Sequence, residues 1–400
     1  MLLKLMSDVS VTSRPSSLDR YIESTAGGET VRAFVPAPLP PIPPLDVSQF
    51  LNLFDRARGA IGRLEGVTTI LPSAPLFLFM YVRKEALLSS QIEGTQSSLS
   101  DLLLFENDET VKVPIDDVTE VSNYVAAIEH GMKRLRGGFP LSLRLLREMH
   151  EILLKSGRGA NKQPGEFRRS QNWIGGTRPG NALFVPTPPS HLDECLGAFE
   201  RFLHMDDPSL PPLIRAGLAH VQFESIHPFL DGNGRLGRLL ITLMLCEAGA
   251  LREPILYLSL FLKSRRDDYY RLLQEVRQTG RWEAWMEFFL TGVAETAEQE
   301  ADTARELMAL FEADRVVIGQ HGRAAASALR VHEFMQKRPI VTIQSVAREL
   351  KLSVPTTGKS LDLLRGAGIV RELTGKRRGR LFAYTKYLSL LDKGTEPLRP

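Results

Sequence analysis

A short glycine-rich turn between two apolar segments, residues 225–238, constrains the fold of this chain more than any other feature. The segment before it, residues 213–225, has helical apolar spacing, and Pro228 disfavours helical backbone at His227, so we expect a helix to end there. Three glycines follow within six residues, and a second apolar helix is expected from Arg235. The sequence therefore predicts two helices joined by a tight turn, with free backbone N–H groups at the start of the second.

The turn carries the residue types that phosphoryl or nucleotidyl transfer requires. Free N–H groups and the positive end of a helix dipole together bind phosphate. Arg235 and Arg238 lie three residues apart on one helical face and supply guanidinium donors. Asp231 offers a carboxylate for Mg²⁺, and His227 offers a base that titrates near neutral pH. Each residue alone has a simpler structural explanation, but their combination in this order favours a catalytic site.

Two other phosphate-binding motifs are excluded by the surrounding sequence. Residues 232–237 fit the G-x-G-x-x-G pattern of dinucleotide-binding folds, which requires a preceding strand and an acidic residue after a second strand. Here the preceding segment is helical, and the acid near the expected distance, Glu253, precedes an apolar run. No Gly-Lys-Ser/Thr follows the turn either, so it is not a P-loop.

The rest of the body is predicted to be mainly α-helical. Apolar residues recur at helical spacing over residues 47–70, 75–92, 118–135, 141–154, 192–203, 235–248, 266–277 and 282–304. Residues 156–190 are rich in Gly, Pro, Asn and Arg and hold a strand signal at residues 183–185, which predicts a hairpin-like insertion. A hydrophobic content of 43% excludes a mainly disordered chain.

The cysteine content and the lack of long apolar runs predict a soluble cytoplasmic protein. Cys195 and Cys246 are too few for a disulfide scaffold or a cysteine-based zinc cluster. No apolar run approaches the roughly 20 residues that a membrane-spanning helix needs. The first residues show no apolar core of a signal peptide.

The first 44 residues are expected to lack regular secondary structure. Residues 1–33 are polar and predicted to be loosely structured. Six prolines in residues 36–44 then impose an extended arm. This arm could bind a proline-recognition module, but we favour an arm packed on the protein's own surface.

Residues 227–238, His-Pro-Phe-Leu-Asp-Gly-Asn-Gly-Arg-Leu-Gly-Arg, match the Fic motif His-x-Phe-x-Asp/Glu-Gly-Asn-Gly-Arg-x-x-Arg at every fixed position. The chain therefore resembles the Fic (Fic/Doc) family, whose typical reaction transfers AMP from ATP to a hydroxyl side chain of a target protein. The resemblance covers about residues 35–300. Residues 36–106 look like the family's N-terminal region, and residues 171–185 look like its flap hairpin. It implies a helical Fic core with a β-hairpin flap.

The resemblance implies a role for each motif residue. His227 would deprotonate the incoming Ser, Thr or Tyr hydroxyl as it attacks the α-phosphorus. Asp231 would hold Mg²⁺ between the α- and β-phosphates, and Arg235 and Arg238 would clamp the outer phosphates until pyrophosphate leaves. The implied ATP-binding residues are Gly232, Asn233, Gly234, Arg235, Leu236, Gly237 and Arg238 of the motif, Ile174 and Gly175 of the flap, and Tyr269 and Tyr270 on the adenosine side.

A second motif, residues 89–94, fits the inhibitory pattern Ser/Thr-x-x-x-Glu-Gly/Asn of Fic proteins. Glu93 is expected at the C-terminal end of its helix, where the dipole disfavours a negative charge. An arginine partner would offset that cost, and the resemblance implies Arg238. A solvated surface glutamate is the simpler interpretation, but beside an intact Fic motif we favour inhibition. Glu93 would then occupy Arg238 and push ATP into an unproductive pose, and Ser89 is the other residue of the inhibitory pattern.

The C-terminal part of the chain is a separate basic unit. Residues 337–380 hold eleven Lys or Arg and three Asp or Glu, whereas the remainder of the chain is net negative. Helices are expected over residues 331–336, 343–350 and 355–365, followed by strands over 369–373 and 380–384 that a basic loop joins. This order resembles a winged helix-turn-helix. DNA contact and protein contact fit it equally well, because a fold alone does not decide function.

The expected organisation is an N-terminal tail (1–34), a Fic N-terminal region with an inhibitory helix (35–110), a Fic catalytic core (111–305) and a winged-helix domain (320–390). The expected function is a self-inhibited protein adenylyltransferase that uses ATP and Mg²⁺. Its partners would be hydroxyl-bearing protein targets and no membrane, with self-modification, DNA and a homodimer left open. The alternatives are a DNA-binding regulator with a nucleotide-sensing Fic core, or a Fic enzyme that transfers another nucleotidyl or phosphoryl group or removes AMP. The intact His227 disfavours a sensor, because binding alone needs no base.

Overall fold

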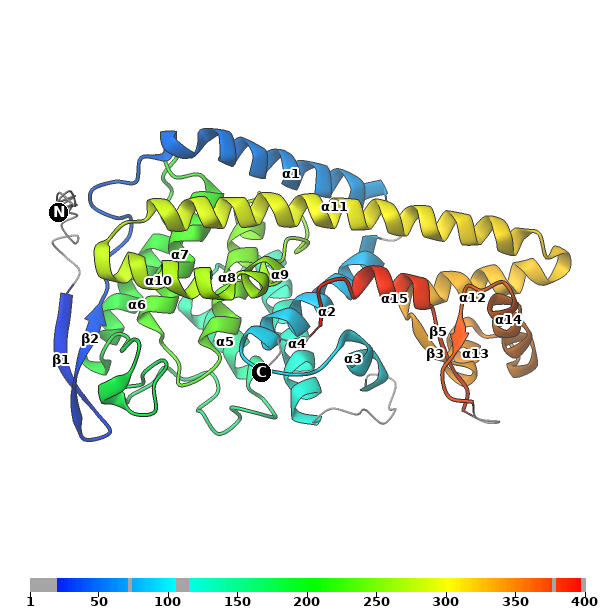
Figure 1. The fold of residues 1–400 in the computed structure, drawn as a ribbon, viewed down its shortest axis with the longest axis horizontal. Helices are drawn as coiled ribbons and strands as arrows, with labels where there is room; N and C mark the ends of the chain where they lie inside the picture. The colour runs from blue at the N-terminus through cyan, green and yellow to red at the C-terminus, as the bar shows by residue number, and fades with distance from the viewer. Residues whose placement is uncertain (1–19, 71–73, 106–114, 376–378, 397–400) are drawn as a thin grey trace, which may run out of the picture.

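The computed structural model describes residues 20–70, 74–105, 115–375 and 379–396. It is an elongated helical molecule in which α11 (Glu283–Gly319) runs along most of the long axis beside α1 (Leu51–Ile70), as Figure 1 shows. The basic C-terminal unit lies at one end of α11, and the body that carries the glycine-rich turn lies along the rest of it. Among these residues, no helix combines the length and apolar character needed to cross a membrane.

Two buried helices, α7 (Pro212–Ile226) and α8 (Asn233–Glu247), pack against each other and flank the glycine-rich turn. Almost every residue of both helices is buried, so a polar side chain within them must be paired or serve a function. Around them the structure places η1 (Val47–Phe50), α2 (Ala74–Ile92), α3 (Leu99–Phe105), α4 (Ile115–Arg136), α5 (Leu143–Leu153), η2 (Pro179–Asn181), α6 (Pro189–Leu203), α9 (Ser259–Ser264) and α10 (Arg266–Thr279). The predicted helices of the body are confirmed within a few residues at their ends, except for the C-terminal end of α11.

The prediction of loose structure over residues 1–33 is wrong for its described part. Strands β1 (Arg20–Ala26) and β2 (Glu29–Val35) form an antiparallel hairpin that turns at Gly27 and Gly28, both with positive φ. Val31 and Ala33 alternate inward, and the backbone N–H of Phe34 donates to the Val185 carbonyl at 2.9 Å. The hairpin is stable here because it packs on the loop before α6, a contact that local composition does not reveal. Residues 1–19 lie outside the described part.

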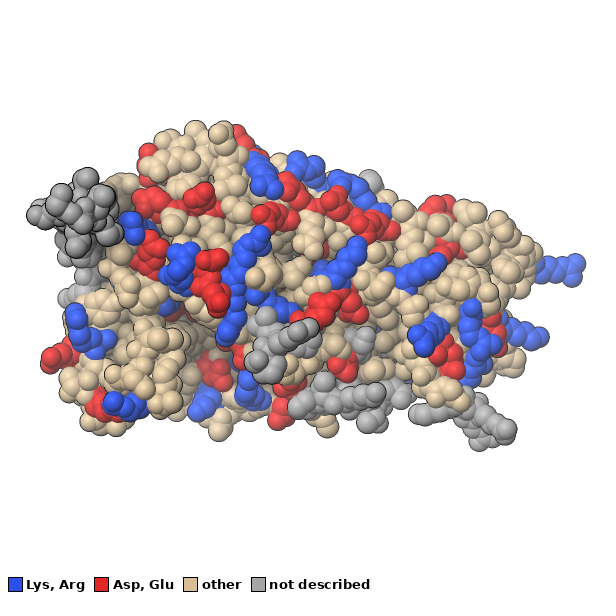
Figure 2. All heavy atoms as spheres, in the orientation of Figure 1, with Lys and Arg blue, Asp and Glu red and all other residues tan. Residues whose placement is uncertain are grey.

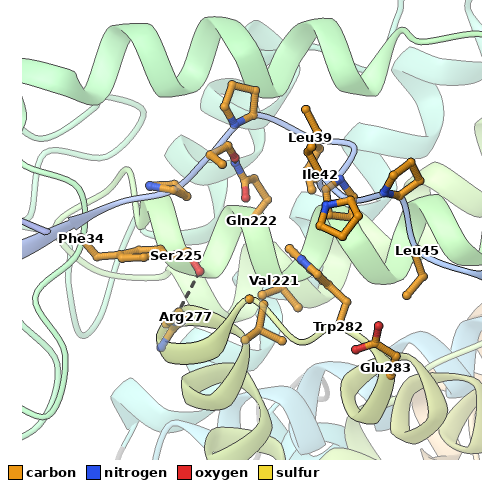
Figure 3. A pocket seen from close by; sticks show the side chains of 18 residues that line it. Phe34, Leu39, Ile42, Leu45, Val221, Gln222, Ser225, Arg277, Trp282 and Glu283 are labelled. Carbon is orange, nitrogen blue, oxygen red and sulfur yellow. Dashed lines mark hydrogen bonds between the residues drawn. The ribbon is translucent and has the colours of Figure 1, made fainter. Parts of the chain in front are cut away.

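The proline-rich segment, residues 36–45, packs on the protein's own surface, as we expected. It crosses α7, where Gln222 Nε2 donates to the Ala37 carbonyl at 2.8 Å and Leu39 is buried (Figure 3). A cavity of about 90 Å³ remains between this segment, α7 and the start of α11, with Trp282 on its far wall. The arm thus covers the helix that leads into the turn.

Three other features of the body differ from the prediction. The strand signal at residues 183–185 produces one isolated bridge, Ile174 to Phe184, and no ladder. Helices α3 and α9 were not expected, because they have only seven and six residues and show no sustained period. Helix α11 continues past residue 304 to Gly319, where buried Leu307 and Ile318 contribute to the core. The predicted gap between the catalytic core and the C-terminal domain is therefore continuous helix.

The C-terminal unit contains the predicted helices and strands, with the single turn η3 and two further elements added. Its order is η3 (Gly322–Ala324), α12 (Ala325–Lys337), β3 (Ile340–Thr342), α13 (Ile343–Leu350), α14 (Val354–Gly366), β4 (Arg371–Glu372), β5 (Leu381–Ala383) and α15 (Thr385–Leu391). The strands form a sheet in the order β3-β5-β4. We did not expect β3, which has three residues, or α15. Part of the basic loop, residues 376–378, lies outside the described residues, and the winged-helix interpretation stays a prediction.

After α15 the chain returns to α2 and forms a contact that we call the C-terminal latch: residues 392–396 with Gln91 and Lys263. Gln91 Nε2 donates to the Thr395 carbonyl at 2.8 Å and to the Ser97 carbonyl at 2.9 Å. Lys263 Nζ donates to Gln91 Oε1 at 2.6 Å and to the Gly394 carbonyl at 3.3 Å. The last turn of α2 is thereby tied to the C-terminal unit.

Candidate active site

His227 caps the C-terminus of α7 in a left-handed conformation, with φ 51° and ψ 62°. This backbone region is uncommon for residues other than glycine, so the surroundings must hold it in place. Arg168, itself buried, donates from Nε to the His227 carbonyl at 2.8 Å and from Nη2 to the Ile226 carbonyl at 3.2 Å. The Arg168 N–H also donates to the Pro228 carbonyl at 2.9 Å. One buried guanidinium therefore fixes the backbone from which the His227 ring projects.

Side-chain amides and a second histidine lock the remainder of the turn. Asn233 Oδ1 accepts from the Phe229 N–H and its Nδ2 donates to the Phe229 carbonyl, both at 2.9 Å. Asn172 Nδ2 adds a bond to the same carbonyl at 3.1 Å. His150 stacks on the Phe229 ring at 3.7 Å, and its Nε2 lies 3.0 Å from the Asp231 carbonyl. The side chain of Asn233 is thus used inside the turn, which leaves its backbone for a ligand.

The first turn of α8 presents unpaired donors to a carboxylate. Among the described residues, no acceptor is found for the backbone N–H groups of Asn233, Gly234 and Arg235. The Glu93 carboxylate lies against Gly234, where a Cβ would overlap Glu93 Oε1. The glycine is required for this close approach, and Glu93 lies beside the free N–H groups that a helix N-terminus offers to an anion.

Arg238 holds that carboxylate. Its Nη2 lies 2.7 Å from Glu93 Oε1, its Nε donates to Ser89 Oγ at 2.8 Å, and its Nη2 also donates to the Ser89 carbonyl at 2.9 Å. Burial disfavours the charge on Glu93, but the Arg238 guanidinium outweighs it and leaves the pKa of Glu93 below its ordinary value. The contact that the resemblance implied between Glu93 and Arg238 is therefore present, and Ser89 belongs to it.

Arg235 is engaged in a different, buried ion pair. It is 1% exposed, and its Nη1 lies 2.6 Å from Glu120 Oε1 on α4. Arg158 approaches the same carboxylate at 3.3 Å. Burial, the largest influence, raises the pKa of Glu120 against the opposing effect of Arg235. The predicted role of Arg235 as a phosphate clamp stays a prediction, because in this structure its guanidinium forms an ion pair with Glu120 of α4.

Asp231 lies at the open edge of the turn, with its side chain 37% exposed. Its Oδ1 accepts from the Gly232 N–H at 2.6 Å and lies 3.6 Å from Arg235 Nη2. Within the described residues, no group of three His, Cys, Asp or Glu side chains could hold a metal by itself. A single exposed carboxylate fits Mg²⁺ that takes its remaining ligands from phosphates and water.

The His227 ring is neutral at physiological pH. Burial, followed by the positive charges of Arg168 and Arg277, lowers the pKa of His227 to about 3. Its Nδ1 is buried and makes no well-formed hydrogen bond among the described residues, and the nearby Glu224 backbone carbonyl raises the pKa of the ring only slightly against these effects. The ring is therefore in the unprotonated form that a general base requires.

The predicted flap and tyrosine residues occupy less central positions. The Ile174 N–H donates to the Phe184 carbonyl at 2.8 Å, and Gly175 follows with positive φ. Tyr269 is buried, with its hydroxyl 2.8 Å from His220 Nε2, so its ring belongs to the core. Tyr270 is 39% exposed, and burial followed by Glu93 raises its pKa to about 12. An adenosine-side role for either tyrosine stays a prediction, as does ATP binding by Leu236 and Gly237.

Sequence reasoning missed five residues that shape the site: Glu120, His150, Arg158, Arg168 and Glu224. Two of them left a signal in the sequence. Glu120 lies on the apolar face of α4 between Val118 and Val121, and Glu224 interrupts the apolar run of α7. A carboxylate on a buried helix face is rare unless it is paired or functional. The other three come from segments that only the fold brings together.

Comparison with known proteins identifies two regions of the chain. Residues 51–133 match the family model described as Fic/DOC family N-terminal, and residues 140–245 match the Fic/DOC family model. Relatives named protein adenylyltransferase Fic from Drosophila yakuba and Drosophila melanogaster are 33% and 32% identical over 161 residues. That stretch covers 40% of this chain and only 30% of each relative.

A solved structure supports the fold as a whole. The crystal structure of a Fic family protein from Desulfovibrio desulfuricans G20 aligns with 83% of this chain and 95% of its own, at 20% identity and a TM-score of 0.53. At this identity the likeness concerns the fold alone. Together with the two matched regions, it shows that the chain contains a Fic/DOC N-terminal region followed by a Fic/DOC domain.

Proposed function

We propose that this chain is a self-inhibited protein adenylyltransferase that transfers AMP from ATP to Ser, Thr or Tyr hydroxyls of target proteins. The observation that carries the proposal is the conjunction, within one turn, of a neutral His227, free N–H groups at the start of α8 and Arg238. The Drosophila relatives, named protein adenylyltransferase Fic, support the same activity over the region that they share with this chain. The C-terminal unit would act as a winged helix that contacts DNA or protein.

The mechanism follows from what each side chain can do. His227 would take the proton of the attacking hydroxyl, so that the new O–P bond forms at the α-phosphorus as the bond to the pyrophosphate breaks. The Gly234 and Arg235 N–H groups would hold the α-phosphate oxygens, and Arg238 would hold the γ-phosphate. Asp231 would bind Mg²⁺, which supplies charge neutralisation at the phosphates.

Inhibition would follow from the position of Glu93. Its carboxylate lies beside the free N–H groups of α8 and uses the Arg238 donor that the γ-phosphate would need. A phosphate brought to the same place would meet a like charge and an occupied guanidinium. The α-phosphorus would then lie out of line with the attacking hydroxyl, a misalignment that can cost orders of magnitude in rate.

The test is transfer of radiolabel from ATP by the wild type and by Glu93→Gly. The variant should label itself or a target with α-phosphate label more strongly than the wild type, and γ-phosphate label should not be incorporated. Glu93→Gly/Arg238→Ala should cancel the gain, because both changes act through one contact. Glu93→Gly/His227→Ala should still bind ATP but lose about 10²–10⁴ in rate.

Gln96→Gly is the matched control, because it loosens the same loop at an exposed residue and leaves the Glu93 carboxylate in place. Gln96→Gly should incorporate the α-phosphate label to the same extent as the wild type. Incorporation of γ-phosphate label would replace AMP transfer by phosphate transfer. Equal labelling by the wild type and Glu93→Gly would refute self-inhibition.

A further inference from the structure

Glu224 is a buried carboxyl without a visible role in the fold. It lies in the last turn of α7, three residues before His227, and its residue is 6% exposed. Within the described residues, its Oε1 has no hydrogen-bond partner, and no hydrogen bond to its Oε2 is found. Glu85 accepts from Tyr124 and Ser259. Glu120 and Glu300 also keep one oxygen without a hydrogen bond among the described residues, but each forms an ion pair, with Arg235 and Lys84 respectively. An unsatisfied buried carboxyl is costly, which calls for a functional explanation.

The carboxyl faces the ring nitrogen of the base that also lacks a partner. Glu224 Oε2 lies 4.0 Å from His227 Nδ1, which is buried and makes no well-formed hydrogen bond among the described residues. The Glu224 backbone carbonyl is the other acceptor near this ring, and it raises the pKa of His227. His227 Nε2 is not among the buried unpaired atoms. The ring therefore turns one nitrogen inward to Glu224 and leaves the other for a substrate.

The first helical turns of α8 make room for this carboxyl. A Cβ at Gly237 would lie 2.5 Å from Glu224 Oε1 and 3.2 Å from the Phe223 ring. Real Cβ atoms do not approach an oxygen so closely, so a side chain at residue 237 would displace Glu224 from His227. The absence of a side chain at Gly237 is thereby explained by the carboxyl behind the base.

We propose that Glu224 is a positioning residue for His227: its carboxyl accepts the Nδ1–H of the ring and so leaves the Nε2 lone pair for the attacking hydroxyl. This inference rests on the proposed AMP transfer and adds to it a residue that lies outside the Fic motif. The role matches the acid of an acid–base–nucleophile triad, which fixes the tautomer of a histidine and stabilises its charged form.

The proton balance of the step is simple. The hydroxyl proton moves to His227 Nε2 while its oxygen bonds to phosphorus and pyrophosphate leaves. The ring is then an imidazolium with N–H groups at both nitrogens, and the Nδ1–H remains on Glu224. A shift of about 1 Å closes the 4.0 Å separation to hydrogen-bond length, and such bonds commonly tighten only in the reacting complex.

The charges around Glu224 allow it to respond to the inhibitory contact. Burial raises the pKa of Glu224 to about 7, Arg238 from α8 and Arg277 from α10 lower it, and Glu93 from α2 raises it. Of these three charged groups, Glu93 alone opposes the ionisation of Glu224, so its departure favours the charged form of Glu224. Glu224 would therefore gain negative charge when Arg238 is released, which strengthens its hold on His227.

The first test reads the tautomer of His227 by two-bond ¹H–¹⁵N spectra of the full chain with ¹⁵N-labelled histidine. The signal is assigned by its loss in His227→Gln. The wild type should show the Nδ1–H tautomer. In Glu224→Gln the amide can donate to Nδ1, so the Nε2–H tautomer should gain population. Gly237→Ala should produce the same change by displacing the carboxyl.

Glu85→Gln is the matched control for removal of a buried carboxyl. Burial likewise raises the pKa of Glu85 to about 7, but its partners are Tyr124 and Ser259. It should leave the His227 tautomer unchanged. An unchanged tautomer in Glu224→Gln would overturn the proposal whether or not the protein transfers AMP.

The second test measures turnover in the Glu93→Gly background. Glu224→Gln should lower kcat roughly tenfold to a hundredfold, less than loss of the base itself, with KM for ATP nearly unchanged. In the His227→Ala background the same change should have no further effect, because Glu224 acts through the ring. An equal further loss without His227 would assign Glu224 to packing. Absence of transfer by Glu93→Gly would count against the proposed function alone, since the tautomer test still decides the role of Glu224.

Discussion

At the scale of single residues, the turn between α7 and α8 depends on histidines that stay neutral inside the protein. His220 is fully buried, with Nδ1 3.0 Å from the Gly237 carbonyl and Nε2 2.8 Å from the Tyr269 hydroxyl. Burial lowers its pKa to about 3, and burial also lowers the pKa of His150 to about 4. Each ring is thus a polar link between elements, and its protonation is prevented by the fold.

This burial predicts a loss of stability in mild acid. The unfolded chain binds a proton at His220 below its ordinary pKa of about 6.5, whereas the folded chain does so only near 3, so stability falls as pH decreases through that interval. Between pH 7 and pH 5 the wild type should lose about 2 kcal/mol more than His220→Gln. Urea unfolding at both pH values measures the difference.

The control for this comparison is His321→Gln, at an exposed residue, which should follow the wild type. Comparing variants is necessary because burial raises the pKa of Glu85 and Glu224 to about 7, an opposite contribution that all three proteins share. Parallel pH profiles of the wild type and His220→Gln would contradict the prediction.

At the scale of elements, α2 is held from two sides at its last turn. On one side Ser89 and Glu93 contact Arg238, and on the other side Gln91 joins the C-terminal latch. Further along α2, buried Lys84 lies 3.7 Å from Glu300 of α11. The helix that carries the inhibitory glutamate is therefore fixed by the C-terminal end of the chain as well as by the site that it blocks.

Disturbing the latch should consequently loosen Glu93 without any change in α2. Gly394 has φ 77°, and a Cβ there would lie 2.7 Å from the Leu260 side chain, so Gly394→Ala should push the latch away. We expect faster amide hydrogen exchange over residues 88–94 and AMP transfer between that of the wild type and Glu93→Gly. Mass-detected exchange on the full chain measures the first effect.

Gly249→Ala is the matched control, because its φ of 67° is similarly unfavourable but a Cβ there meets nothing within 4 Å. It should leave exchange in residues 88–94 unchanged. If Gly394→Ala exchanges at the same rate as this control, the latch does not restrain α2.

The same scale shows what the sequence could predict. The long helices were predictable because a buried stripe repeats along each of them. The β1–β2 hairpin and α15 were not, since each is stabilised by segments far away in the chain. In the site, residues 227–238 are neighbours in sequence, whereas Glu93 and Arg238 are 145 residues apart and needed the family resemblance. The sequence around Glu120 and Arg168 contains no pattern from which their contact partners could be predicted.

At the scale of the whole molecule, charge is divided between the body and the C-terminal unit. In the view of Figure 2, Lys and Arg side chains are prominent at the end where Figure 1 places α12–α14. Lys351 and Lys359 are exposed there and form no ion pair with any described residue, in contrast to Arg365, which lies 3.2 Å from Asp362. These lysines are free to contact phosphates.

If the unit binds DNA, its affinity for any duplex should fall steeply with salt, because each lysine or arginine contact releases counterions. For the full chain, Lys351→Ala/Lys359→Ala should reduce the slope of log K against log salt by up to about 2. Lys133→Ala/Lys162→Ala removes two exposed charges in the body of the molecule and should keep the slope. Absence of duplex binding at low salt would favour protein contact.

Helix α11 fixes the rotation of the C-terminal unit about the helix axis relative to the body. It is one uninterrupted helix of 37 residues, with α1 packed along it at one end and α12 and α15 at the other. A helix turns roughly 100° and advances about 1.5 Å for every residue. One residue inserted in its middle would swing the C-terminal unit a quarter of the way around the axis, whereas seven would return it nearly to its original bearing. The number of residues in α11 therefore sets the direction in which the basic unit faces.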